Sequence, residues 1–326
     1  MDADTKEIVR VDELATGGNG DKFGGRTHLP EVTEHCQSSE YVPELLHGGT
    51  RRDLKPLSVL QPNGPSFTLS DGNLIEWQKW RMRVTFNSRE GAVIHDIRYQ
   101  GRSVLHRLSF SEMHIFCLRI DPAIDGQNNT LVQEESLPVG LDAQTNPKGN
   151  LYEVRQSKIR SSTGLDASPG NNRVFKIQNT HKLNPISGSP VAYKLVPPPT
   201  QLLLADHGSI QSDRAKFARH HLWVTKYKDD EFYAGGRNPF MTRAEEDGVA
   251  GAAARNDIVE DEDLVLWSVF GLTHNPRVED WPVMPVEILQ VHLTPSDFFT
   301  QNPAIDVPCE KDSGSTLMST CCKGQD

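Results

Sequence analysis

Three short apolar runs joined by very short connections constrain the fold of this chain most. Residues 80–86 alternate between apolar and polar side chains, the pattern of a half-buried strand. Residues 92–99 and 103–110 follow as further strand-like runs, and the connections at 87–91 and 100–101 each end in glycine, as hairpin turns commonly do. The sequence therefore predicts an antiparallel β-meander.

Composition supports a mainly β class. The 326 residues suffice for one large or two ordinary domains, and the 21 prolines and 25 glycines fall mostly between short apolar runs, as expected of loop-rich β architecture. A net charge of −10 gives no basic stripe, so we expect no nucleic-acid partner. No run of about 18 apolar residues exists to cross a membrane, so no membrane association is expected.

The cysteines and the termini bear on the compartment. The five cysteines form no CxxC pair, no zinc spacing and no disulfide framework: Cys36, Cys117, Cys309, Cys321 and Cys322. The acidic N-terminal residues lack the apolar run of a secretory signal, and the last residues carry no Ser-Lys-Leu peroxisomal tripeptide. We expect an intracellular protein, cytoplasmic or peroxisomal.

A second constrained block lies near the C-terminus. Residues 264–270 form an apolar run of the length and β-branched or aromatic content of a buried strand. A turn at Gly271 then delivers Thr273 and His274. The prolines and Trp281 that follow fix an irregular path into a second apolar run, residues 286–293.

This block, DLVLWSVFGLTHNPRVEDWPVMP, resembles the C-terminal signature of the copper amine oxidases, with its Thr-His pair and Trp-Pro-x-Met-Pro segment. The words YVPELLHGGTRRDLKPLSVLQP, GNLIEWQKWRMRVTFNSREG, HIFCLRIDPAIDGQNN and HHLWVTKY extend the resemblance from about Tyr41 to Pro308, and its motifs are fungal-like. The resemblance implies the antiparallel β-sandwich of the family's catalytic domain and a homodimer. It also implies oxidative deamination of a primary amine to an aldehyde, ammonia and hydrogen peroxide, with copper and topaquinone as cofactors.

One departure from the family pattern lies inside the chain. In the family a long segment separates Ser-Glu-Met from a His-x-His-Ile-Phe motif, whereas here Ser111, Glu112 and Met113 run directly into His114. We therefore expect an incomplete sandwich with a large internal deletion. The expected divisions are an N-terminal linker and lead-in at 1–64, the truncated catalytic domain at 65–308 with the deletion at about 112–114, and a disordered tail at 309–326.

The resemblance also assigns candidate copper ligands. His114 and His274 match two of the family's three copper histidines, and Glu112 occupies the position of the remaining one. The cofactor tyrosine of the family follows an asparagine, but none of the six tyrosines here does so: Tyr41, Tyr99, Tyr152, Tyr193, Tyr227 and Tyr233. The catalytic base belongs to the missing segment. We expect topaquinone to be absent, copper to be weak or absent, and the chain to be catalytically inactive as written.

Glu112 also offers a substitute ligand set. Glu112 and His114 would share one face of an intact strand, and His274 could approach as in the family. Two histidines and a carboxylate form the ligand set of non-haem iron, or of a weak Cu, Zn or Mn site.

A peripheral cation site is a further implication of the resemblance. Asp121 and Asp263 match carboxylates that some family members offer to a hard cation such as calcium, helped by the carbonyls of Pro122 and Leu264. Ala123 replaces a further aspartate, so we expect a weaker or empty site. His220 and His221 precede a predicted strand, where neighbours face opposite ways, and we interpret them as residues that do not form a ligand pair.

Three interpretations of function stay open at this point. The chain is an inactive member of the family, a non-enzymatic partner or modulator of a full-length paralogue, or a fragment of an active oxidase. Because removing central strands uncovers apolar faces, we also expect a poorly satisfied middle of the sandwich.

Overall fold

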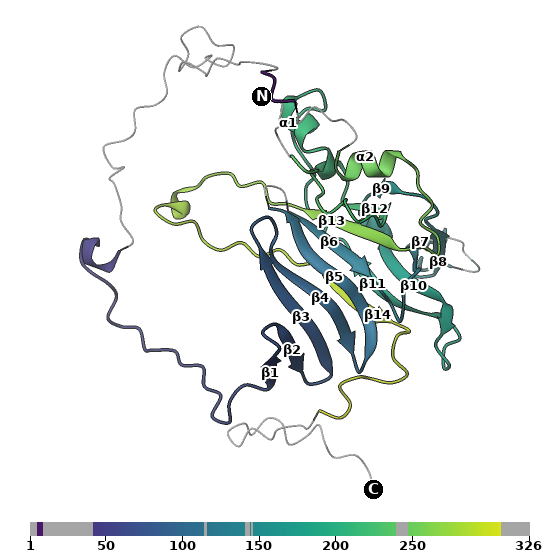
Figure 1. The fold of residues 1–326 in the computed structure, drawn as a ribbon, viewed down its shortest axis with the longest axis horizontal. Coiled ribbons are helices and arrows are strands. Elements are labelled where there is room, and N and C mark those ends of the chain that lie inside the picture. Colours follow the sequence, from purple (N-terminus) through teal and green to yellow (C-terminus); the bar gives the residue numbers. More distant parts are fainter. Residues whose placement is uncertain are drawn as a thin grey trace.

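The computed structural model describes residues 5–8, 42–113, 116–140, 144, 146–238 and 247–307. Two antiparallel β-sheets face each other across a common core, and helices are few and short (Figure 1). The predicted mainly β class is confirmed. The copper-ligand candidate His114 and the predicted tail at 309–326 lie outside the described residues.

The first sheet runs from the meander at one edge to short late strands at the other. In spatial order it contains β1 (Phe67–Ser70), β2 (Leu74–Trp77), β3 (Trp80–Asn87), β4 (Gly91–Tyr99), β5 (Arg102–Glu112), β6 (Phe116–Pro122), β13 (Leu264–Phe270), β12 (Leu222–Lys226) and β9 (Thr163–Leu165). The three predicted runs are β3, β4 and β5, and Gln100 and Gly101 take the positive φ values of a tight turn, 50° and 77°.

The second sheet covers one face of the first. It contains β14 (His292–Ser296), β11 (Pro190–Val196), β10 (Val174–Leu183), β7 (Thr130–Pro138) and β8 (Tyr152–Lys158), again in spatial order. Buried apolar side chains of both sheets meet in one cluster, represented by Ile97 of β4, Leu266 of β13 and Phe175 of β10. This cluster is the core of the sandwich.

β13 lies between β6 and β12 in the first sheet and is buried at every residue. Alternate side chains, such as Leu264 and Leu266, face the second sheet, whereas Val265, Trp267 and Val269 face a smaller cluster on the other side. That cluster includes residues of α2 (Val249–Ala254) and η3 (Lys216–Arg219). The predicted buried strand at 264–270 is therefore confirmed, and its continuous apolar run reflects burial of both faces.

The second apolar run, residues 286–293, forms a strand only at its end. β14 begins at His292, and the preceding Val286 and Ile288 are 87% and 76% exposed. Pro282 and Pro285 lack the amide hydrogen that a central strand must donate, which favours an irregular path here. The remaining short helices are η1 (Pro43–Leu45), η2 (Pro169–Asn171), α1 (Ile210–Arg214) and η4 (Val278–Asp280).

The expected poorly satisfied middle stays a prediction, although apolar side chains are exposed at the strand ends beside the junction. Phe110, Met113 and Phe116, which flank the junction at residues 113–114, are exposed. By contrast, Ser268 Oγ is the one buried side-chain nitrogen or oxygen without a hydrogen-bond partner among the described residues. No helix in the described part of the chain is both long and apolar enough to cross a lipid bilayer.

Candidate functional site

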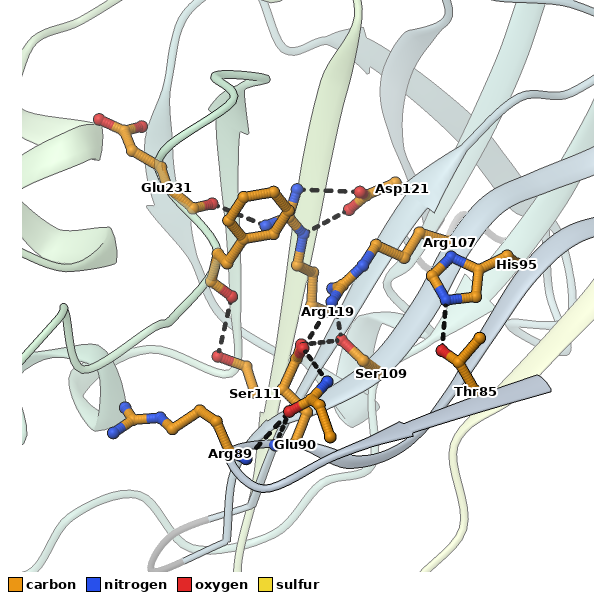
Figure 2. Close-up of polar contacts among 12 residues, drawn as sticks. Thr85, Arg89, Glu90, His95, Arg107, Ser109, Ser111, Arg119, Asp121 and Glu231 are labelled. Carbon is orange, nitrogen blue, oxygen red and sulfur yellow. Dashed lines mark hydrogen bonds and ion pairs between the residues drawn. The ribbon is translucent and has the colours of Figure 1, made fainter. Parts of the chain in front are cut away.

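Three arginine–carboxylate pairs line the outer face of the first sheet, which points away from the second sheet. Arg119 on β6 is fully buried and binds Asp121 through two hydrogen bonds, with Nε to Oδ1 at 2.7 Å and Nη2 to Oδ2 at 2.9 Å. Its Nη1 donates to the carbonyl of Glu231 at 2.7 Å, and its guanidinium carbon lies 4.7 Å from the centre of the Phe232 ring. Figure 2 shows Arg119 between the Asp121 carboxylate and the Glu231 backbone.

Arg107 and Glu90 form the second pair. Arg107 Nη2 donates to Glu90 Oε2 at 2.6 Å, and Ser109 Oγ donates to the other carboxylate oxygen at 2.8 Å (Figure 2). Asn87 adds a hydrogen bond of 3.0 Å. Burial alone would raise the pKa of Glu90, but the hydrogen bonds from Arg107, Ser109 and Asn87 lower it. This carboxylate is therefore held ionised.

Glu112, for which the resemblance predicted the position of a copper histidine, belongs to the third pair. Its Oε1 accepts hydrogen bonds from Arg89 Nη2 at 2.7 Å and from the Gly235 amide at 3.1 Å. Burial raises the pKa of Glu112, and the Arg89 charge opposes that rise. A guanidinium at this distance also opposes binding of a second cation.

Two of the three pairs hold one loop segment, residues 231–236, over the sheet by hydrogen bonds, and Arg107 of the remaining pair lies 5.1 Å from the centre of the Phe232 ring. Besides the contacts to Glu231 and Gly235, the Ala234 amide donates to Ser111 Oγ at 2.7 Å. Arg89 also lies over the Tyr233 ring at 4.5 Å. Every carboxylate of the three pairs has a cationic partner, so the arrangement is suited to holding this segment rather than to proton transfer.

His274 lies on the irregular segment after β13. Its Nε2 is 2.6 Å from Asp280 Oδ2, and Asp280 also accepts hydrogen bonds from Arg277. Although partial burial acts in the other direction, the hydrogen bonds from Arg277 and His274 lower the pKa of Asp280. A carboxylate that accepts from one ring nitrogen orients the imidazole and leaves the other nitrogen, Nδ1, as the metal donor. This geometry fits the metal-ligand position that the resemblance gave to His274.

The described residues contain no group of three or more His, Cys, Asp or Glu side chains placed to hold a metal ion. His114 is not among those residues, so the predicted set of Glu112, His114 and His274 stays a prediction. Glu112 and His274 are each engaged by another partner, Arg89 and Asp280 respectively.

The two carboxylates of the predicted peripheral cation site line one cavity of about 400 Å³, together with Pro122, Ala123 and Leu264. Asp121 is engaged by Arg119, whereas Asp263 Oδ1 accepts a hydrogen bond from the Asn128 amide at 3.2 Å. The sequence thus identified residues that share a cavity. Of these two aspartates, Asp263 is the one whose charge is not matched by a buried arginine.

His220 and His221 both contact Asp166, a link that sequence reasoning missed. His220 Nδ1 is 2.9 Å from Asp166 Oδ2, and His221 Nδ1 is 3.2 Å from Oδ1. His221 Nε2 donates to the Thr200 carbonyl at 2.8 Å. Because β12 begins only at Leu222, the alternation of a strand does not separate the two rings.

Comparison with known proteins gives the family. The profile described as copper amine oxidase, enzyme domain, matches residues 68–113 and 114–314. Copper amine oxidase 1 of Aspergillus niger is 39% identical over 477 aligned positions, which include 99% of this chain and 71% of that protein. Copper amine oxidase 1 of Schizosaccharomyces pombe is 36% identical over 70% of this chain and 33% of its own length.

A solved structure gives the same result in three dimensions. The copper-containing benzylamine oxidase of Hansenula polymorpha superposes with a TM-score of 0.74 at 28% identity, covering 82% of this chain and 66% of that chain. The predicted antiparallel β architecture of the amine oxidase catalytic domain is thereby confirmed. From the profile match, the Aspergillus relative and this shared fold it follows that the chain belongs to the copper amine oxidase family, whose members oxidatively deaminate amines.

Proposed function

We propose that this chain is a catalytically inactive, incomplete copper amine oxidase domain. It keeps the family's outer strands and His274, but by itself it does not convert a primary amine to an aldehyde, ammonia and hydrogen peroxide. The observation that carries the proposal is that none of its six tyrosines follows an asparagine, so the precursor of topaquinone is missing. Topaquinone supplies the electrophilic carbonyl that a primary amine attacks in this family, and no residue of the chain can be assigned that role.

The copper donors support the same proposal only in part. His274 is oriented by Asp280 as a metal-ligating histidine would be, and we propose His114 and His274 as the residues that take copper. Glu112 does not fit as the third donor, because Arg89 and the Gly235 amide already bind its Oε1. Two imidazoles without a third firm donor give weak copper binding.

For the peripheral cation we propose a weak calcium site at Asp263, assisted by the carbonyl of Leu264. Its neighbour Asp121 is held by Arg119, which reduces the charge available to a cation. Calcium normally takes six to eight oxygen ligands, so a site with one available carboxylate binds weakly. Asp263→Asn should abolish whatever calcium-dependent rise in melting temperature the chain shows. A rise that Asp263→Asn leaves unchanged would remove this assignment.

The relatives guide our proposals for substrate class and compartment, and the family resemblance guides the one for oligomeric state. The relatives include a histamine oxidase, a peroxisomal diamine oxidase and a peroxisomal primary amine oxidase, so they share amines as a substrate class and no single amine. We propose a primary amine as the substrate class of the complete domain, a homodimer as its assembly, and a cytoplasmic or peroxisomal location.

The test is an oxidase assay on the purified chain after incubation with copper. The Aspergillus niger relative, treated identically, serves as the positive control. We expect no hydrogen peroxide above the amine-free blank, and no coloured adduct with phenylhydrazine, which reacts with quinone carbonyls. Peroxide formation that depends on the amine, or an adduct band, would overturn the proposal.

A further inference from the structure

The segment between β13 and β14, residues 271–291, displays an unusual number of apolar side chains. Figure 1 shows it as a light green loop that extends away from the two sheets. Its large exposed apolar residues are Leu272, Val278, Trp281, Val283, Met284, Val286 and Ile288. Single exposed apolar residues are common, but this concentration on one segment marks an interaction surface.

Contacts within the segment hold it in shape. Asp280 accepts hydrogen bonds from the Arg277 amide at 2.9 Å and from His274 Nε2 at 2.6 Å. Arg277 Nη2 also reaches Glu287 Oε1 at 3.2 Å. These contacts link the first part of the segment, near Arg277, to its later part, near Glu287, so the apolar side chains lie on a constrained backbone. A pre-ordered surface loses less conformational entropy when a partner binds.

A second apolar surface begins where this segment leaves the sheet. Phe116, at the start of β6, stacks on Phe270, at the end of β13, with ring centres 5.6 Å apart. Phe116 also lines a groove of about 290 Å³ together with residues 201–205 and 271–273. Phe110 and Met113, at the end of β5, are exposed as well. The groove thus connects the first residues of the segment, 271–273, with Phe116 at the start of β6.

The comparisons indicate that a relative has a section that this chain lacks. The family profile matches in two parts that meet between Met113 and His114. The alignment with the Aspergillus niger relative spans 477 positions, although this chain has 326 residues. The relative therefore carries residues without a counterpart here, and from the break in the profile match we infer that they fall between the end of β5 and the start of β6. That section both leaves and re-enters the fold at the exposed ends of these strands.

We propose that the segment 271–291 and the ends of β5 and β6 form a docking surface for a separate polypeptide that is homologous to this section of the relative. The partner is a β-forming chain with an apolar face, and it completes the sandwich by non-covalent association. The proposal rests on the family membership and goes beyond the proposed catalytic silence. Binding is measured without turnover, so the two proposals fail independently.

The experiment co-expresses this chain with the tagged section of the Aspergillus niger relative that lies between the counterparts of Met113 and His114. We expect recovery in a ratio near one to one on the tag. The variant Trp281→Ser with Val286→Asp should reduce the recovered chain at least tenfold. Ile186→Asp is the matched control, because Ile186 is equally apolar and 73% exposed but lies between β10 and β11 of the second sheet. It should leave recovery unchanged.

Three outcomes would overturn the proposal. The first is failure to recover this chain with the section, and the second is equal recovery of the double variant and of Ile186→Asp. The third comes from light scattering on the chain alone: a dimer that the double variant dissociates would make a second copy of the chain the occupant. The substituted side chains are exposed, so the variants should keep the circular dichroism spectrum of the parent chain.

Discussion

Removing one partner of the Arg119–Asp121 pair should destabilise the fold strongly. Arg119 is fully buried and its partner nearly so, with side-chain exposures of 0% and 4%. Arg119→Met leaves the Asp121 carboxylate inside the sheet face without its cation, and it removes the hydrogen bond to the Glu231 carbonyl. Loss of one member of a buried pair costs about 3 to 5 kcal/mol, a large part of a typical unfolding free energy of roughly 5 to 15 kcal/mol.

Urea denaturation provides the assay. With a slope of about 3 kcal/mol per M, a loss of this size lowers the unfolding midpoint by about 1 to 1.7 M. The double variant Arg119→Met with Asp121→Leu should recover part of the loss, because it leaves no buried charge without a partner.

The matched control is Arg81→Met, whose ion pair with Asp96 has side chains that are 37% and 38% exposed. An exposed pair of this kind should contribute less than about 1 kcal/mol. If Arg119→Met cost no more than Arg81→Met, or if the losses from the two single variants at 119 and 121 simply added in the double variant, the reasoning from buried charge would be refuted.

Three further outcomes are expected. Burial raises the pKa of Glu112, whereas hydrogen bonds overcome burial and lower the pKa of Glu90. As the pH falls from about 6 to about 3, the parent chain should therefore gain stability relative to Glu112→Gln but lose stability relative to Glu90→Gln. If these two stability differences changed with pH in the same direction, the reasoning would be contradicted. A methyl group at position 164 would overlap the His220 ring, so Gly164→Ala should cost about 1 to 3 kcal/mol in thermal unfolding and His220→Ala should restore most of that loss. The Cys117 thiol is fully buried and burial raises its pKa, so iodoacetamide should label it only above the unfolding midpoint, as read by peptide mass spectrometry; labelling of the folded chain would contradict the burial.

Local sequence patterns predicted the parts of the fold that depend on neighbouring residues. The meander β3–β5 and the buried strand β13 follow from the spacing of apolar residues and from turn glycines, and the structure has them within a residue or two of the predicted bounds. The pairing of β13 with β6 does not follow from such patterns. Residues 116–122 and 264–270 lie far apart in sequence, and only the family resemblance placed them in one domain.

In the candidate site too, sequence motifs predicted some features, whereas others depend on contacts between distant residues. Motifs located His274, Asp121 and Asp263, and the structure places the two aspartates at one cavity. No local pattern predicts that Arg89 binds Glu112, or that two neighbouring histidines share Asp166. Such contacts depend on side chains that strands and loops bring together over long separations, and hydrophobic periodicity carries no information about them.

The late position of β13 in the sequence also affects folding during synthesis of the chain. β6 ends at Pro122, but the strand that pairs with its free edge begins only at Leu264. At roughly 5 to 20 residues per second, a ribosome needs roughly 7 to 30 s to synthesise the intervening residues. During this interval the edge of β6 has no native partner within its own chain, and unpaired edges recruit other strands. Translation speed and access to chaperones should therefore affect the yield of folded protein.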